Sequence, residues 1–348
     1  MPLLYQHLIN HFSELLQQVK TSPGTRIYNL SVPHFALFLL FRTDSFIVIE
    51  DSTESADALY NDLLFFSQLV PEHGGTISYF PPASSPELIG KRASVLLAGV
   101  TQSKIGIITS PEAWRTGFSI PLVKDAVITI RRGLSIERDT LNKMLSGLGY
   151  KKVSVVVEKG EYSQREWIFD IFPTTEDIPL RVEFFGDEIE MMRSFDIETQ
   201  RSIREAENLT VLPAEEDDPN RTIIDELAYS INPEVFVVQD IAVSIPELPV
   251  DRLPFYSVSH LSFAGEGTDG MEHSIKGMGI VPEERKELGD IPSAIKKAGY
   301  DTLIVLPSQA QAERMKDILF DGGVIAPVIK VKDLESYAGS ICIVTGTL

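Results

Sequence analysis

Two arginines and two aromatic residues in the middle of the chain have the types and spacing of a protein-binding surface. Arg165 and Trp167 lie two residues apart in one β-rich run, and Arg181 and Phe185 lie four apart in the next. Residues an even number apart in a strand share a face. Arginine forms charge-assisted hydrogen bonds with carboxylates, and arginine and aromatic side chains dominate interface energies. The four residues predict a protein-binding patch; the alternative is that Phe185 closes the core and the arginines are solvated.

A nucleotide-binding loop is missing where the sequence would place one. A phosphate loop needs G-x-x-x-x-G-K-[ST], so that backbone amides and a lysine surround the phosphates. The first predicted strand-to-helix turn, residues 30–36, has no glycine or lysine, and Pro33 removes an amide donor. Residues 89–92 contain part of the motif, but Ser85 stands at the first glycine position and Arg92 replaces the Ser/Thr for magnesium. We therefore expect no nucleotide hydrolysis by this chain.

Three further patterns resemble ligand-binding sites, but each is better explained as an ordinary structural feature. Residues 265–270 match G-x-G-x-x-G, yet two carboxylates there would repel a pyrophosphate, so a flexible linker is predicted. His7 and His11 lie one helical turn apart without a third zinc ligand, and we expect them on the polar flank of a helix. Residues 215–218 are four carboxylates suited to a hard cation, but like charges repel and favour a solvated loop. The sequence thus predicts no catalytic residue, cofactor or metal.

Four β-rich runs between residues 153 and 195 are expected to position the patch. Turn residues at 159–160, 173–179 and 186–187 separate the runs, which is typical of an antiparallel meander. The third run alternates in polarity, with Leu180, Val182 and Phe184 on one face and Arg181, Glu183 and Phe185 on the other.

Outside the meander, short apolar strands alternate with helical patterns, which indicates an α/β protein with a parallel sheet covered by helices. We predict helices over residues 3–20, 34–42, 53–68, 86–99, 136–148, 221–230, 289–298 and 309–320, and a strand over 209–212. The predicted division is an α/β domain in two parts (1–122 and 207–264), an inserted α+β domain (123–206), a linker (265–274) and a second small α/β domain (275–348). The part from 207 to 264 is too small for its own core and is expected to rejoin the first sheet.

The composition is that of a soluble, cytoplasmic protein. The 31 basic and 50 acidic residues give a net charge of −19, which disfavours direct binding to nucleic acid. A single cysteine, Cys342 in an apolar run, excludes an internal disulfide and predicts a small core residue. We expect no signal peptide, because the first residues lack its pattern, and the longest apolar stretch, residues 33–41, is too short to span a bilayer. The chain stops directly after a predicted strand, so we expect a piece of a longer protein.

Several motifs resemble bacterial transcription-repair coupling factors, the Mfd family, in their region similar to the excision-repair protein UvrB. In and around the meander they are G-L-G-Y at 147–150, G-E at 160–161, F-D-I-F-P at 169–173, L-R-V-E-F-F-G-D-E-I at 180–189, R-S-F-D at 193–196 and T-Q-R-S at 199–202. Similar segments occur at 85–93, 109–113 and 303–313. The resemblance therefore covers nearly the whole chain.

The resemblance implies a degenerate P-loop-NTPase-like (UvrB-like) domain with an inserted UvrA-binding domain. It implies a non-catalytic module that recruits UvrA to stalled RNA polymerase in transcription-coupled nucleotide excision repair. The family's UvrA contacts fall on Arg165, Arg181 and Phe185, and Trp167 is a further candidate. The resemblance also implies that the C-terminal domain of the parent protein masks this surface at rest. It further implies that ATP, magnesium, DNA and RNA polymerase are bound by other domains of the parent, an ATP-dependent translocase.

The sequence departs from the family in two places. Glu166 and Trp167 follow Arg165 where the family usually has two glycines, and the Glu166 carboxylate is placed to compete for the guanidinium of Arg165. The part from 208 to 264 is shorter than usual. Two other functions stay open at this point: a nucleotide-binding half of an ATPase, completed by a partner chain, and a structural module that restrains the motor.

Overall fold

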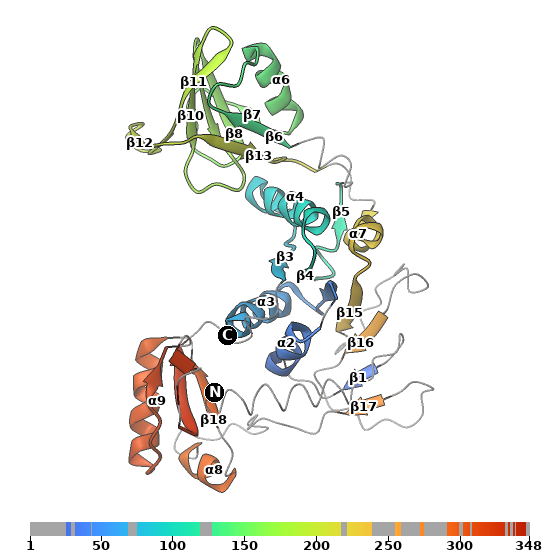
Figure 1. Ribbon diagram of the computed structural model, residues 1–348, viewed down its shortest axis with the longest axis vertical. Helices are drawn as coiled ribbons and strands as arrows, with labels where there is room; N and C mark the ends of the chain where they lie inside the picture. Colours follow the sequence, from blue (N-terminus) through green and yellow to red (C-terminus); the bar gives the residue numbers. More distant parts are fainter. Residues whose placement is uncertain are drawn as a thin grey trace. The chain divides into compact units, whose positions relative to one another are not determined.

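A computed structural model describes residues 26–28, 32–42, 44–68, 75–118, 127–216, 221–238, 255–258, 272–274, 291–298, 302–306, 308–330, 333–334, 337 and 339–345. The chain forms two compact units, residues 1–77 with 234–348, and residues 78–233 (Figure 1). The structure is mixed α/β with parallel sheets, as the alternating pattern predicts. Within the described residues, no helix has the length and apolar character to cross a membrane.

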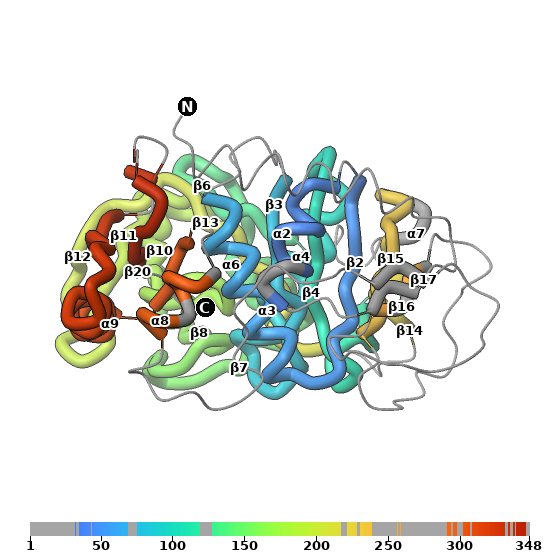
Figure 2. The backbone as a smooth tube through the Cα atoms, turned by 90° about the horizontal axis from the view of Figure 1, so that it is seen from below, coloured from blue at the N-terminus to red at the C-terminus, as the bar shows by residue number. Residues whose placement is uncertain are grey.

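The first unit contains a parallel sheet built from both of its chain segments. The part of the sheet that lies within this unit follows the order β17 (Glu272–Ser274), β1 (Arg26–Tyr28), β16 (Phe255–Val258), β15 (Glu234–Val238) and β2 (Phe46–Ile49). Figure 2 shows β15 and β16 side by side. Because β15 pairs with β2 and β16 pairs with β1, residues 234–238 and 255–258 of the predicted second part rejoin the first sheet.

Helices α2 (Val32–Leu40) and α3 (Thr53–Ser67) pack against each other in this unit. Aromatic rings join α2 to the sheet: Phe236 of β15 contacts Phe35 and Phe38 edge to face, each at 5.9 Å between ring centroids. Every residue of β2 is buried, as expected for a parallel strand covered on both faces.

Asp62 is a buried carboxyl group on the core-facing side of α3. Burial raises its pKa from the ordinary 3.8 to about 6. Since the folded-state pKa is the higher one, its contribution to stability is present below pH 3.8 and is lost as the pH rises through about 6. We expect Asp62→Asn to raise the free energy of unfolding by roughly 1–3 kcal/mol at pH 8 and by much less near pH 4.

Urea denaturation at several pH values measures this effect, with the exposed Asp57→Asn on the same helix as the control. A gain that is equal at both pH values, or no gain at pH 8, would contradict the assignment.

The C-terminal part of the same unit has its own small sheet and core. Strands β18 (Thr302–Leu306), β20 (Ile341–Thr345) and β19 (Val328–Ile329) are parallel in that order, and α8 (Ile291–Ala298) and α9 (Gln309–Asp321) belong to the same cluster. Cys342 is buried in β20, as predicted, and burial raises the pKa of its thiol to about 11. Such a thiol carries almost no thiolate at neutral pH and is a packing residue.

The linker predicted for 265–274 is wrong at its end. Residues 272–274 form β17, which pairs in parallel with β1. Glutamate, histidine and serine are residue types without a strong β preference, so the sequence does not indicate a strand at this position. Residues 265–271 lie outside the described part of the chain, as does the helix predicted for 3–20, with His7 and His11.

In the second unit, the motif fragment at 85–92 is the start of helix α4 (Pro86–Thr101) and not a phosphate loop. The Ser85 side chain caps the helix by accepting a hydrogen bond from the Leu88 backbone N–H at 3.3 Å, and Pro86 occupies the first helical position. Helix α4 packs against α7 (Ile223–Ile231) and contacts β4 (Ile105–Thr109). Strand β3 (Thr76–Tyr79) precedes α4 in the chain.

Arg92 of α4 is the buried centre of a polar network. Its Nε donates to Glu216 at 2.6 Å, and its Nη1 donates to the carbonyl oxygens of Pro81 and Ala113 at 2.6 and 2.8 Å. Burial lowers the pKa of Arg92, and the hydrogen bond to Glu216 works against this shift. The solvated loop predicted for 215–218 is therefore wrong at Glu216, because an arginine distant in sequence supplies the opposite charge.

The middle of the second unit is an α+β domain with a six-stranded sheet. The strand order is β12 (Ser202–Glu205), β11 (Glu188–Phe195), β10 (Leu180–Phe185), β9 (Ile168–Phe172), β8 (Glu161–Arg165) and β7 (Lys151–Lys152). All neighbours are antiparallel except β7 and β8, so the antiparallel meander is confirmed from residue 161 to 195. The predicted run at 153–158 is not a strand, and the run at 161–172 divides into β8 and β9. Helix α6 (Arg138–Gly147) packs its Leu141 and Leu145 into the core on one face of this sheet (Figure 1).

This domain extends beyond the predicted boundary at 206. Strand β13 (Asn208–Val211) pairs antiparallel with β6 (Ile128–Arg131), and Leu209 and Val211 are buried in the domain's core. The sequence pattern instead predicts that the strand at 209–212 belongs to the α/β domain. The assignment failed because the partner strand lies far away in sequence, where local periodicity carries no information.

Candidate protein-binding surface

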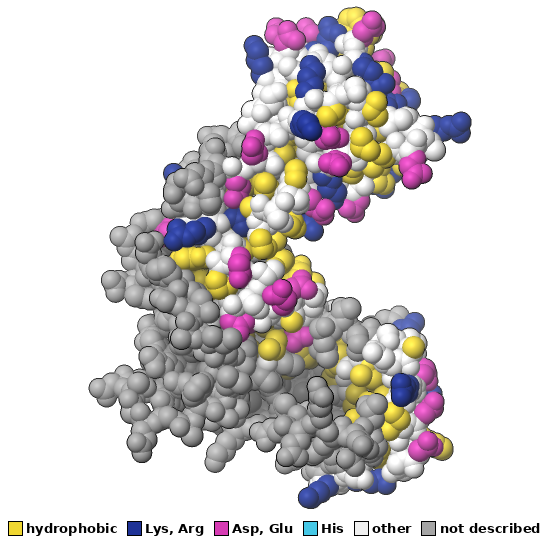
Figure 3. All heavy atoms as spheres, turned by 180° about the vertical axis from the view of Figure 1, so that it is seen from behind, with side chains coloured by type: hydrophobic (Ala, Val, Ile, Leu, Met, Phe, Trp, Pro, Cys, Tyr) yellow, Lys and Arg dark blue, Asp and Glu magenta, His cyan; other side chains and the backbone are white. Residues whose placement is uncertain are grey.

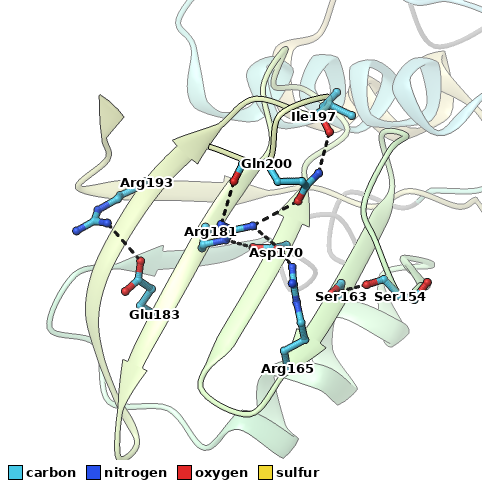
Figure 4. A network of polar contacts seen from close by, with 9 residues as sticks. All are labelled: Ser154, Ser163, Arg165, Asp170, Arg181, Glu183, Arg193, Ile197 and Gln200. Atoms are coloured by element: carbon cyan, nitrogen blue, oxygen red, sulfur yellow. Dashed lines mark hydrogen bonds and ion pairs between the residues drawn. The ribbon is translucent and has the colours of Figure 1, made fainter. Parts of the chain in front are cut away.

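The face of the sheet opposite α6 brings Arg165 and Arg181 together around one carboxylate (Figure 4). Arg165 ends β8, Asp170 lies in β9, and Arg181 lies in β10. The strand register places Asp170 directly between Ser163 of β8 and Arg181 of β10. The two arginines predicted to share a patch are therefore neighbours on one face.

Asp170 is buried, and both of its carboxylate oxygens accept hydrogen bonds from arginine. Arg181 donates from Nε to Oδ1 at 2.6 Å and from Nη2 to Oδ2 at 3.0 Å, the two-pronged geometry that guanidinium and carboxylate groups favour. Arg165 donates from Nη2 to Oδ2. The hydrogen bonds to Asp170 raise the pKa of Arg181 above its ordinary value, although burial acts in the opposite direction.

Arg181 is also held from the other side. Its Nη1 donates to the Gln200 backbone carbonyl at 3.3 Å, and its Nη2 reaches the Gln200 side-chain oxygen at 3.5 Å. The guanidinium carbon lies 4.6 Å from the centre of the Phe195 ring, within the range of a cation–π contact. Every guanidinium nitrogen of Arg181 thus donates within the domain, and only 17% of the side chain is exposed.

Arg165 has a different environment, because 54% of its side chain is exposed and Asp170 holds it through Nη2. Among the described residues, its Nε and Nη1 have no hydrogen-bond partner. The competition from Glu166 that the sequence suggested is not seen, since Arg165 pairs with Asp170 instead. Arg165 is the arginine of this pair that a second protein can reach.

Phe185 is the most exposed aromatic residue of the sheet, with 78% of its surface accessible. It ends β10, directly before a turn at Gly186, whose φ of 65° favours glycine. Its neighbour Phe184 points the other way and contacts the buried Phe169 with ring centroids 5.6 Å apart. The alternative that Phe185 closes the core is therefore excluded.

The predicted position of Trp167 on the face of Arg165 is wrong. Glu166 and Trp167 form the turn between β8 and β9, and Glu166 has a φ of 20°. Arg138, the first residue of α6, donates from Nη1 to the Glu166 carbonyl at 2.6 Å and lies 4.1 Å from the centre of the Trp167 ring. Since α6 covers the opposite face of the sheet, Trp167 is held toward that side. The turn interrupts the alternation on which the prediction depended.

Asp170 and Gln200 are site residues that sequence reasoning missed. Asp170 stands in the apolar run I-F-D-I-F, where alternation places it on the face opposite Phe169 and Ile171. A carboxylate in such a run signals a partner of opposite charge, and this signal was available in the sequence. Gln200 lies outside the strands and has no comparable signal.

The surroundings of the arginine pair carry charges of both signs. Glu183 and Arg193 on the neighbouring strands lie 3.7 Å apart and are partly exposed. Figure 3 shows basic and acidic side chains intermixed over the visible face of the described residues. Such a surface suits recognition of a protein better than recognition of a phosphate backbone.

Residues 128–216 match the family model of the UvrB interaction domain. The chain therefore resembles this family over the α+β domain of its second unit. It is also similar to transcription-repair-coupling factors, as its motifs predicted: 39% identical over 89 residues to that of Escherichia coli K12, 33% over 143 residues to that of Haemophilus influenzae, and 32% over 224 residues to that of a bovine strain of Staphylococcus aureus. These matches cover 26%, 40% and 59% of the chain but 8%, 12% and 18% of the relatives, so the chain spans a small part of their length.

The arginine pair, Asp170 and Phe185 all lie inside the matched residues 128–216. The match also ends at residue 216, beyond β13 and at the glutamate that pairs with Arg92. The family model and the pairing of β13 with β6 therefore agree that the domain extends beyond residue 206.

Proposed function

We propose that the UvrB interaction domain of this chain binds UvrA and thereby recruits it to stalled RNA polymerase in transcription-coupled nucleotide excision repair. The observation that carries the proposal is the highly exposed Phe185 on the same sheet face as the half-exposed Arg165, within residues that match this domain family. In the proposed complex, Phe185 fills an apolar pocket of UvrA and Arg165 binds a carboxylate. The role of the chain is binding and not catalysis.

The remaining parts fit this role as a scaffold within a longer protein. We propose that the parallel sheet of the first unit is a degenerate, UvrB-like nucleotide fold; Pro33 within the first turn of α2 supports this, because it removes an amide donor where a phosphate would bind. On this proposal, ATP, magnesium, DNA and RNA polymerase are bound by other domains of the parent translocase. The C-terminal domain of the parent covers the UvrA-binding surface in the cytoplasmic resting state.

Gel filtration and calorimetry of the full chain with the UvrA encoded in the same genome test the proposal. We expect a stable complex that elutes ahead of either protein. No complex, together with saturable binding of ATP by the chain, would instead favour the nucleotide-binding half of an ATPase.

Arg165→Glu is expected to weaken this complex by at least roughly tenfold, because it places a carboxylate opposite the proposed carboxylate of UvrA. The affinity of the wild-type chain is expected to fall with added salt, and that dependence is expected to weaken in the variant. Arg132→Glu, an equally exposed arginine outside the patch, serves as the matched control and leaves the affinity unchanged. Equal losses from both substitutions would show that general charge, and not this position, determines binding.

A further inference from the structure

Asp170 is a buried carboxylate in a central strand, and it holds arginines from the strands on both sides. Burial of an unpaired carboxylate is costly, so this residue depends on the donors that surround it. Three N–H groups reach its two oxygens, two from Arg181 and one from Arg165. Asp170 thus joins β8, β9 and β10 on the face that carries the proposed UvrA contacts.

Asp170 binds the two arginines in different ways. Arg181 is held in a fixed plane by two bonds to Asp170, by Gln200 and by the Phe195 ring. Arg165 receives a single anchor at Nη2, and the rest of its guanidinium stays exposed. A long side chain with one fixed end loses less rotamer freedom on binding than an unrestrained one, which favours affinity.

The charges of this group are unbalanced. Two guanidinium groups share one carboxylate, which leaves one positive charge on the face. Glu183 lies nearby but pairs with Arg193. A carboxylate from a partner would complete the group by binding the exposed edge of Arg165, while Asp170 keeps the other edge in place.

We propose that Asp170 is a positioning residue of the UvrA-binding surface: it holds Arg165 in the orientation that a carboxylate of UvrA binds, without contacting UvrA itself. This inference rests on the proposed function. It assigns Arg181 to the support of the surface, together with Gln200, and Arg165 to the direct contact.

Asp170→Asn distinguishes the effect of Arg165 orientation from the effect of surface charge, because the two effects change the affinity for UvrA in opposite directions. The substitution keeps the shape but removes the negative charge, so the face becomes more positive and attracts a carboxylate more strongly. At the same time Arg165 loses its charged anchor and gains rotamer freedom. If orientation dominates, as we propose, Asp170→Asn lowers the affinity for UvrA about tenfold. Unchanged or tighter binding would overturn the proposal.

A double-mutant cycle with Arg165→Ala shows whether Asp170 acts through Arg165. We expect Asp170→Asn to weaken binding less than about threefold in the Arg165→Ala background, because the side chain that it positions is gone. Losses that simply multiply would indicate a merely structural role and would overturn the inference. Calorimetry with the UvrA of the same genome gives all four affinities.

Two further measurements protect the test against misfolding. Asp170→Asn/Arg181→Gln removes the buried pair together and leaves no unpaired buried charge, so it replaces Asp170→Asn if that variant does not fold. Its affinity is compared with that of Arg181→Gln alone, and the same weakening is expected. In nitrogen-15 NMR spectra of the free chain, the Nε–H proton of Arg181 should exchange slowly with water, and this slow exchange should be lost in Asp170→Asn. If the slow exchange persists in the variant, Asp170 does not hold Arg181 in place and the proposal is contradicted.

The outcomes distinguish this inference from the proposed function. If the wild-type chain does not bind UvrA, the proposed function fails and the inference fails with it. If the wild-type chain binds and Asp170→Asn binds equally well, the proposed function stands and the positioning role alone is refuted.

Discussion

Phe185→Ala is expected to lower the affinity for UvrA by roughly 30-fold, about 2 kcal/mol, and to leave the free energy of unfolding unchanged. Phe185 is 78% exposed, so its ring contributes little to folding and is available to a partner. A large aromatic side chain that becomes fully buried on binding is typical of an interface hot spot. Titration calorimetry gives the affinity, and thermal unfolding followed by circular dichroism checks the fold.

The chain offers a matched control in Phe320, another strongly exposed phenylalanine, which lies in α9 of the other unit. Phe320→Ala removes the same ring from a surface outside residues 128–216, and we expect no change in UvrA binding. Equal binding by Phe185→Ala and the wild type would remove Phe185 from the site. Equal losses from both substitutions would point to nonspecific hydrophobic contact.

Arg92→Ala is expected to destabilise the second unit by roughly 3–5 kcal/mol, since it leaves the buried Glu216 without its cation. The backbone carbonyls of Pro81 and Ala113 lose their donor as well. The guanidinium also lies 4.1 Å from the centre of the Phe80 ring, so the substitution removes packing together with charge. Both tryptophans, Trp114 and Trp167, lie in residues 78–233, so their fluorescence during urea denaturation reports on this unit.

The control for Arg92 is its exposed neighbour on the same helix, Lys91, whose substitution by alanine should change the free energy of unfolding by less than about 0.5 kcal/mol. Arg92→Met combined with Glu216→Gln removes both charges, and we expect this pair to cost less than Arg92→Ala alone. If the double substitution lowers the free energy of unfolding by the sum of the two single effects, the ion pair is not the source of the stability.

Local periodicity was enough to predict the faces of the central strand. In β10 the residues alternate between buried and accessible, as the polarity of Leu180 to Phe185 indicated. The same reasoning identified the meander and placed helices α3, α4 and α9 close to their observed bounds. These features depend on neighbours within a few residues, and such neighbours are visible in a single sequence.

Contacts between segments that are far apart in the sequence are visible only in the tertiary structure. The sequence by itself placed Arg181 and Phe185 on one face of a strand, because strand alternation depends on adjacent residues. The tertiary structure decided that Asp170 holds both arginines, that Arg138 draws Trp167 toward the other face, and that Glu216 is buried against Arg92. The physical reason is that strand register and helix packing bring together charges that are far apart in the sequence. Local sequence patterns do not predict which of these distant residues will pair.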